Sequence, residues 1–169
     1  MNGPLRPLAT QRATSGAWER LRILTENRTI AMVGLSADPM RPSHFAAIYM
    51  QSMGYDIVPV NPRYVGETIL GQPVYARLED IPSPVGIVDV FRRAEEAPAI
   101  AKSAIAIGAN VLWLQLGVMS DEAARLAREA GLEVVMDRCV KIEHARFFGG
   151  LNLVGMNTGV VTSRRSIGI

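Results

Sequence analysis

The chain has 169 residues, 49% of them hydrophobic and 20% charged, which is typical of one compact soluble domain with a real core. Its formal net charge is only +2 and its aromatic content 6%, so it lacks the basic excess and the exposed aromatic side chains of a nucleic-acid-binding surface. One cysteine and two histidines exclude an intramolecular disulfide framework and provide no cluster of zinc ligands. We therefore expect a cytoplasmic protein that binds neither nucleic acid nor metal.

Helices and strands are predicted to alternate along most of the chain. Residues 1–16 form a predicted flexible leader, and residues 17–26 an amphipathic helix that carries Trp18, Leu21 and Leu24 and packs across the edge of a sheet. Short apolar runs predict strands at 29–34, 55–60, 86–90, 110–114 and 132–136, and longer periodic runs predict helices at 43–53, 94–107, 120–130 and 137–146. This order indicates an α/β fold with three layers and a parallel sheet of about five strands.

Two further segments bear on membranes and partners. Residues 99–117 are largely apolar, but Lys102, Asn110 and Gln115 interrupt them, so a helix followed by a strand is expected there and a membrane span is not. Residues 147–169 contain no acidic side chain. We predict that they form a C-terminal extension or arm, which contacts either the domain itself or a protein partner such as a second copy of the chain.

The turn after the first predicted strand has the features of a phosphate-binding site. Gly34 permits a tight backbone turn, and Ser36 and Ser43 provide hydroxyl groups. Pro42 suits the first position of the following helix, whose free N–H groups and positive dipole end favour an anion, and Arg41 lies beside it. The alternative is an ordinary strand-to-helix turn, which is common in α/β proteins but seldom combines an arginine with two serines.

Two features of the sequence argue against NAD as the ligand. Gly34 stands alone where the dinucleotide-binding pattern has three glycines. The second strand runs into Asn61, Pro62 and Arg63, where a protein that binds NAD has an acidic residue for the ribose. Arg63 instead favours a phosphorylated ribose, which both NADP and coenzyme A contain, so arginine chemistry alone leaves these two ligands open. A solvated loop charge is the simpler alternative for Arg63.

Five motifs in the same order resemble those of the small single-domain coenzyme A-binding proteins: GLSADPMRPS, VNPR, IVDVFRR, WLQLG and VMDRCVKIEHAR. The resemblance spans about residues 17–165. These proteins are similar to the nucleotide-binding domain of the succinyl-coenzyme A synthetase α subunit. The resemblance implies a Rossmann-like coenzyme A-binding domain over residues 17–146, with coenzyme A or an acyl derivative as its ligand.

The same resemblance implies a role for each motif. It implies that residues 34–43 hold the pyrophosphate and that residues 61–63 meet the adenosine and its 3′-phosphate. It further implies that Val90, Phe91 and Arg92 line the site at the end of the third predicted strand. The residues themselves add two candidates nearby: Asp89, which needs a hydrogen-bond partner if it is buried, and Gln115, which is long enough to reach a ligand.

No residue pattern predicts catalysis. Asp137, Cys139 and His144 include an acid, a nucleophile and a base, but Cys139 and His144 are about 140° apart around a continuous helix and diverge. Asp137 is instead expected to cap the last helix. Cys139 follows that cap, where helix N–H groups lower the pKa of a thiol, and we hypothesise that it forms a mixed disulfide with bound coenzyme A under oxidation.

The sequence therefore predicts a protein that binds coenzyme A or an acyl-coenzyme A through a strand-to-helix phosphate loop and has no catalytic activity of its own. Two alternatives stay open at this point. One is an NADP-dependent oxidoreductase that uses Arg63 for the 2′-phosphate. The other is a non-catalytic nucleotide-binding subunit of an acyl-coenzyme A ligase-like complex, with residues 147–169 as its contact surface.

Overall fold

The computed structural model describes residues 15–149 of the chain, so most of the predicted leader and most of the predicted C-terminal arm lie outside the described residues. Its central sheet contains five parallel strands, β1 (Thr29–Val33), β2 (Asp56–Val60), β5 (Ile87–Val90), β6 (Val111–Leu114) and β7 (Glu133–Val135). Their order across the sheet is β2-β1-β5-β6-β7. The chain leaves β1 in one direction to form β2 and returns to the other side of β1 to form β5. The carboxyl ends of β1 and β5 are therefore the topological switch point.

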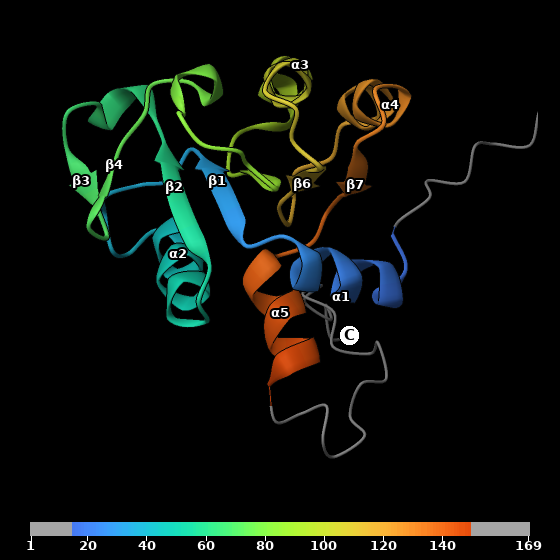
Figure 1. Ribbon diagram of the computed structural model, residues 1–169, viewed down its shortest axis with the longest axis horizontal. Helices are drawn as coiled ribbons and strands as arrows, with labels where there is room; N and C mark the ends of the chain where they lie inside the picture. The colour runs from blue at the N-terminus through green and yellow to red at the C-terminus, as the bar shows by residue number, and fades with distance from the viewer. Residues whose placement is uncertain (1–14, 150–169) are drawn as a thin grey trace, which may run out of the picture.

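Helices cover both faces of the sheet (Figure 1). One face carries α1 (Ala17–Glu26), α2 (Pro42–Ser52) and α5 (Val140–Phe148), and the other carries α3 (Ala97–Ala106) and α4 (Asp121–Glu129). The connection from β2 to β5 contains a short hairpin, β3 (Thr68–Ile69) and β4 (Gln72–Pro73), and 3-10 turns at Pro62–Tyr64 and Leu78–Asp80. A further 3-10 turn, Ala94–Glu96, leads into α3. The arrangement confirms the predicted Rossmann-like three-layer α/β/α fold.

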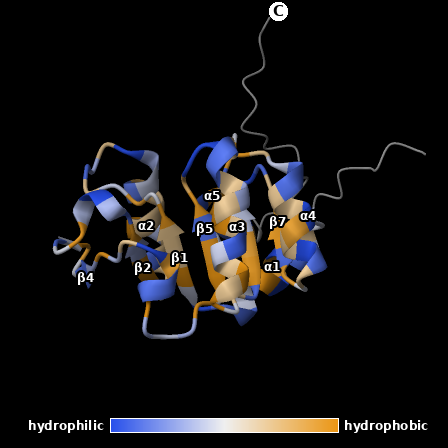
Figure 2. Ribbon diagram, turned by 90° about the horizontal axis from the view of Figure 1, so that it is seen from above, coloured by the Kyte–Doolittle hydropathy of each residue, from blue (hydrophilic) through white to orange (hydrophobic). Residues whose placement is uncertain are grey.

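The two faces of the sheet bury alternate side chains of each strand. Along β1, Ile30 and Met32 pack with α1, α2 and α5, whereas Ala31 and Val33 pack with α3 and α4. This is the two-residue period of a strand that is buried on both faces. Figure 2 shows the strands as a largely hydrophobic band between the helices. The core therefore holds the strands rigidly, and the loops at their carboxyl ends project from a fixed frame.

Local signals explain why the elements begin and end where they do. All five predicted strands agree with the observed ones to within one residue at either end. Pro42 stands in the first turn of α2, as expected for a residue without a backbone N–H. The Ser120 hydroxyl accepts a hydrogen bond from the Ala123 N–H at 3.2 Å and caps α4.

Two expectations about helices are wrong. The first helix lies on a face of the sheet and not across its edge, because Ile23 and Leu24 are fully buried there, while Trp18 is 83% exposed. Asp137 does not cap α5, since Cys139 takes the N-cap position. The Asp137 backbone has a φ of +57°, and its carboxylate accepts a hydrogen bond from the N–H of Gly117 at 2.9 Å. Asp137 therefore ties the loop after β7 to the loop after β6.

Candidate functional site

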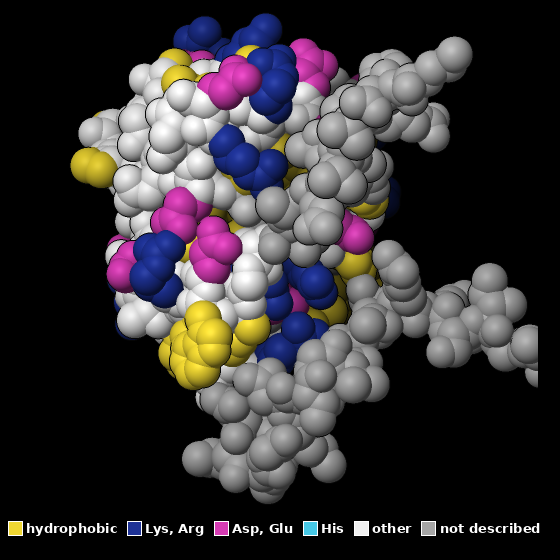
Figure 3. Space-filling model, turned by 90° about the vertical axis from the view of Figure 1, so that its right-hand side faces the viewer, with side chains coloured by type: hydrophobic (Ala, Val, Ile, Leu, Met, Phe, Trp, Pro, Cys, Tyr) yellow, Lys and Arg dark blue, Asp and Glu magenta, His cyan; other side chains and the backbone are white. Residues whose placement is uncertain are grey.

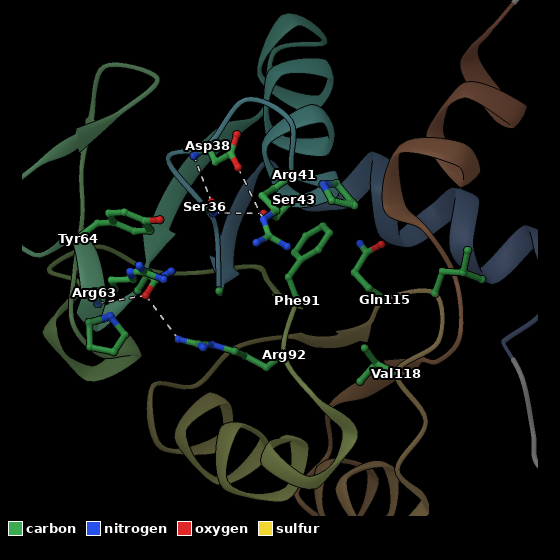
Figure 4. Close-up of a pocket in the computed structure, with 15 residues that line it drawn as sticks. Ser36, Asp38, Arg41, Ser43, Arg63, Tyr64, Phe91, Arg92, Gln115 and Val118 are labelled. Atoms are coloured by element: carbon green, nitrogen blue, oxygen red, sulfur yellow. Dashed lines mark hydrogen bonds and ion pairs between the residues drawn. The ribbon is translucent and has the colours of Figure 1, made fainter.

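A cleft of about 670 Å³ opens at the carboxyl ends of β1, β2, β5 and β6, at the switch point of the sheet (Figure 4). Val90 does not line it, because alternate residues of β5 face opposite layers and Val90 is fully buried on the α3 and α4 side. The other residues predicted to contact a ligand all do line it: Gly34, Ser36, Arg41, Pro42, Ser43, Asn61, Pro62, Arg63, Phe91 and Arg92. Asp38 lies within the predicted turn of residues 34–43 but was not singled out, and Tyr64, Leu116 and Val118 were not assigned to the site, although each follows the end of a strand.

At Gly34 the chain leaves β1 and turns toward the cleft, close to the residue that follows β5. Its φ is +90°, and its N–H donates to the Val60 carbonyl at 2.8 Å. A Cβ atom at this position would lie 2.6 Å from the Phe91 carbonyl oxygen, which is nearer than real Cβ atoms approach. Both the backbone conformation and the space therefore require glycine here.

Short hydrogen-bonded turns shape the loop between Gly34 and α2. The Ser43 hydroxyl accepts from the Ser36 N–H at 3.1 Å, and the Ser36 hydroxyl accepts from the Asp38 N–H at 3.1 Å. The ring of His44 contacts the Ser36 carbonyl oxygen through Nδ1 at 2.8 Å. These contacts fold the loop over the start of α2, which has no side-chain N-cap. Pro42 has no N–H, and the N–H groups of His44 and Phe45 both donate to the Arg41 carbonyl, at 3.0 and 3.2 Å, so in the first turn of α2 the Ser43 N–H is the one available to an anion in the cleft.

The side chain of Asn61 joins three segments of the cleft wall. Its Nδ2 donates to the Leu35 carbonyl at 3.0 Å, and its Oδ1 accepts from the Arg63 N–H at 3.1 Å and from Arg92 Nη2 at 3.4 Å. Only 7% of Asn61 is exposed. The amide is therefore bonded to protein groups, and it fixes the positions of the two arginines relative to the turn after β1.

Three arginines bring positive charge to the cleft (Figure 4). Arg41 Nε lies 3.8 Å from the Asp38 carboxylate, and Arg92 Nε lies 3.9 Å from the Glu96 carboxylate, distances at which the attraction is weak in water. Arg63 is exposed and forms no ion pair within residues 15–149. The part of the cleft that these three arginines line therefore carries excess positive charge.

The opposite end of the cleft is uncharged and is built around Gln115. Gln115 Nε2 donates to Asp89 Oδ1 at 2.7 Å, so the buried acid does have the hydrogen-bond partner that it needs. The Asp89 side chain is fully buried, and its Oδ2 has no partner among the described residues. Burial raises the pKa of the Asp89 carboxyl to about 8, against the lowering effects of the hydrogen bonds from Gln115 and from the Val90 backbone. Asp89 is therefore protonated at neutral pH.

The three residues Asp137, Cys139 and His144 each have a separate structural environment. His144 lies within α5, is 4% exposed, and its Nδ1 is 3.0 Å from the Tyr49 hydroxyl of α2. Burial raises the pKa of the Cys139 thiol, although the N–H groups of Ile142 and Lys141 act in the opposite direction. The expectation of a lowered thiol pKa is therefore wrong, because desolvation outweighs the helix N-terminus.

The part of the chain that the structure describes also bears on metal, membrane and nucleic-acid binding. There, no three histidine, cysteine or carboxylate side chains come together as metal ligands, and no helix combines the length and apolar character needed to cross a membrane. Figure 3 shows one face of the molecule, on which basic and acidic side chains lie interspersed. Such a mixed face differs from the basic stripe that follows a nucleic-acid backbone.

A parallel sheet with a cleft at its switch point is the general architecture of Rossmann-like nucleotide-binding domains. The family model described as a CoA binding domain matches residues 28–145. The chain belongs to this family, as its five sequence motifs predicted. The match runs from β1 into α5 and includes every residue that lines the cleft.

Individual proteins are similar over most of the chain. The uncharacterized protein YneT of Bacillus subtilis (strain 168) is 42% identical over 123 residues, which are 73% of this chain and 90% of YneT. The structure of cell-free ID.343 from Thermus thermophilus is 37% identical, with a TM-score of 0.76 over 79% of this chain and 100% of that one. A hypothetical protein from Pyrococcus horikoshii OT3 is 35% identical, with a TM-score of 0.77 over 88% of this chain and 100% of that one.

Proposed function

We propose that the protein binds coenzyme A or an acyl-coenzyme A in the cleft and catalyses no reaction on it. The observation that carries the proposal is the presence of Arg41, Arg63 and Arg92 around one cleft whose wall includes the uncapped start of α2. Coenzyme A carries a pyrophosphate and a 3′-phosphate, and guanidinium and helix N–H groups are common partners of phosphate oxygens. Membership of the CoA binding domain family supports the same ligand.

The phosphates are assigned to separate parts of the cleft. The turn of residues 34–43 and the start of α2 are proposed to hold the pyrophosphate, because this backbone offers N–H groups and Arg41 adds charge. Arg63 is assigned to the 3′-phosphate, since it is exposed and forms no ion pair with the described residues. Phe91 offers an apolar surface between these groups and the uncharged end.

The absence of catalysis is part of the proposal and rests on the side chains that line the cleft. Among the described lining residues there is no histidine, lysine or cysteine. The one carboxylate, Asp38, accepts a hydrogen bond from the Met40 N–H at 2.9 Å and lies beside Arg41. Both contacts of this carboxylate are thus made within its own loop.

Calorimetric titration with coenzyme A, acetyl-coenzyme A and NADPH tests the ligand. We expect binding of both coenzyme A ligands in the micromolar range and none of NADPH. Binding of NADPH alone would favour the NADP-dependent oxidoreductase, in which Arg63 meets a 2′-phosphate. If none of the three binds, the ligand assignment is overturned and a subunit that needs a partner becomes the better explanation.

Removal of the Arg63 side chain tests the assignment of the 3′-phosphate. We expect Arg63→Ala to weaken coenzyme A roughly tenfold and dephospho-coenzyme A less than twofold, because only coenzyme A has the phosphate that the guanidinium contacts. Arg125→Ala on α4, which lies outside the cleft, is the control and should change neither affinity. Equal losses for the two ligands would remove Arg63 from this role.

A further inference from the structure

The cleft has two chemically different ends. Arg63 and Tyr64 stand at one end, with Arg92 reaching toward them, and Gln115 and Val118 stand at the other (Figure 4). The second end carries no charged side chain among the residues that line it. If the phosphates of a coenzyme A ligand occupy the arginine end, its uncharged pantetheine arm must extend toward Gln115. That arm contains two amide groups, each with an N–H donor.

Gln115 is the polar side chain at the uncharged end, and its orientation is fixed from behind. Its Nε2 donates to Asp89 Oδ1 at 2.7 Å, and the residue is only 4% exposed. Its Oε1 accepts no hydrogen bond from the described residues. The bond to Asp89 therefore leaves the amide oxygen as the free acceptor of the side chain.

An acidic residue such as Asp89 is unusual at the centre of a buried sheet. It is fully buried beside Met32 and Trp113 on the neighbouring strands, and its Oδ2 has no partner among the described residues. An apolar side chain here would avoid the free-energy penalty of a buried, half-satisfied carboxyl. Such departures from stable packing occur where a residue serves the site, and the contact that Asp89 makes is with a residue of the cleft.

We propose that Asp89 is a positioning residue: it holds the Gln115 amide so that Gln115 Oε1 accepts a hydrogen bond from an amide N–H of the ligand. The cleft thereby selects a nucleotide with an uncharged, amide-bearing arm over a nucleotide that ends at its phosphates. This inference rests on the proposed function and adds a specificity element to it. Gln115 contacts the ligand, and Asp89 acts through Gln115.

The test compares coenzyme A with adenosine 3′,5′-bisphosphate, which has phosphates but no arm. We expect Gln115→Leu to weaken coenzyme A roughly three- to tenfold, the loss of one hydrogen bond, and to leave the bisphosphate within twofold. Asp89→Val should cause the same selective loss although residue 89 does not line the cleft. Asp89→Asn keeps an acceptor for Gln115 Nε2 and should retain the wild-type affinity within twofold at neutral pH.

Each outcome separates this inference from the proposed function. If the wild-type protein binds neither ligand, the proposed function fails. If it binds coenzyme A but Gln115→Leu weakens both ligands equally or neither, the role of Gln115 is overturned. If Gln115→Leu is selective but Asp89→Val is not, Asp89 is only structural. Thermal unfolding checks that the variants fold, and Asp89→Ser, which is too short to meet Gln115, replaces Asp89→Val should that variant not fold.

Discussion

Among single residues, Gly34 has the strictest backbone requirement near the cleft. Its positive φ disfavours any side chain, and the Phe91 carbonyl occupies the place of a Cβ. Gly54 separates these two effects, since its φ is +87° but nothing lies within 4 Å of its hypothetical Cβ. The two glycines therefore form a matched pair for measuring the effect of the close approach.

We expect Gly34→Ala to lower the free energy of unfolding by about 3 kcal/mol and Gly54→Ala by about 1 kcal/mol. The difference arises because alanine at position 34 must push β1 away from the chain after β5. Denaturant unfolding of both variants measures it. Similar losses for the two would mean that the backbone near Phe91 relaxes freely, and the close contact would then not constrain the cleft.

The residues that line the cleft were largely predictable because carboxyl ends of parallel strands meet at one edge of a sheet. This rule places Ser36 and Arg63 at one edge of the sheet, and the resemblance to the coenzyme A-binding proteins adds Arg92. The rule does not indicate which way a residue at the end of a strand points, and the family resemblance implied that Val90 lines the site, although Val90 faces the core. The hydrogen bonds of the Asn61 side chain to Leu35 and Arg92 could not be predicted either, because these partners lie 26 and 31 residues away in the sequence.

At the scale of secondary-structure elements, a buried ion-pair network joins the first helix to the last. Glu143 of α5 is 2% exposed; its carboxylate lies 2.8 Å from Arg20 Nε of α1 and 3.0 Å from Arg146 Nη1. Arg20 is 6% exposed and also donates to the Ser15 carbonyl. Both charges are thus removed from water and depend on each other.

We expect Glu143→Ala to lower the free energy of unfolding by about 3 to 5 kcal/mol, because it leaves Arg20 buried without a counter-charge. Glu129→Ala is the control, since Glu129 pairs with Arg125 at 2.8 Å in the same type of residue pair but on the surface. That change should alter stability by less than about 1 kcal/mol. Chemical denaturation distinguishes them, and equal effects would contradict the structural role of the buried pair.

The same network explains why the packing of α1 was not predicted. A helix with Trp18, Leu21 and Leu24 suggests that these side chains face the core. The structure buries Arg20 with Ile23 and Leu24 and leaves Trp18 in solvent, because the partner of Arg20 is a glutamate more than a hundred residues away. Hydrophobic periodicity carries no information about a buried pair of opposite charges. The strands, whose runs are mainly apolar, were predicted to within one residue at either end.

At the scale of the whole molecule, two buried groups set opposite trends of stability with pH. Burial raises the pKa of Asp89 to about 8, so between about pH 4 and pH 8 the unfolded chain is ionised there and the folded protein is not. The contribution of Asp89 to the free energy of unfolding is fully present below about pH 4 and is lost as the pH rises through this window. Burial lowers the pKa of His144, so the stability linked to that ring is full above about pH 6.5 and is lost as pH falls.

Between about pH 6.5 and pH 8, Asp89 is the one of these two groups whose ionisation still changes the free energy of unfolding. We expect the free energy of unfolding to fall there by up to about 1.4 kcal/mol per pH unit from this group. Asp89→Asn should remove that part of the slope, and His144→Phe should flatten the decline at lower pH instead. Denaturant unfolding at a series of pH values measures both, and an unchanged slope in Asp89→Asn would mean that Asp89 is already ionised in the folded protein.

The strand order of the sheet has a consequence for how this domain can change its ligand. Four separate loops, after β1, β2, β5 and β6, supply the cleft, and most of their side chains belong to neither hydrophobic cluster. Substitutions in one loop can therefore alter one part of the ligand while the others keep their contacts. The residues that line the cleft and those that form the core are therefore largely separate, and Gly34 is a position where a change is expected to affect both the fold and the cleft. Because each loop can change separately, we expect that the ligand preference of the cleft can be altered one loop at a time, by stepwise mutation.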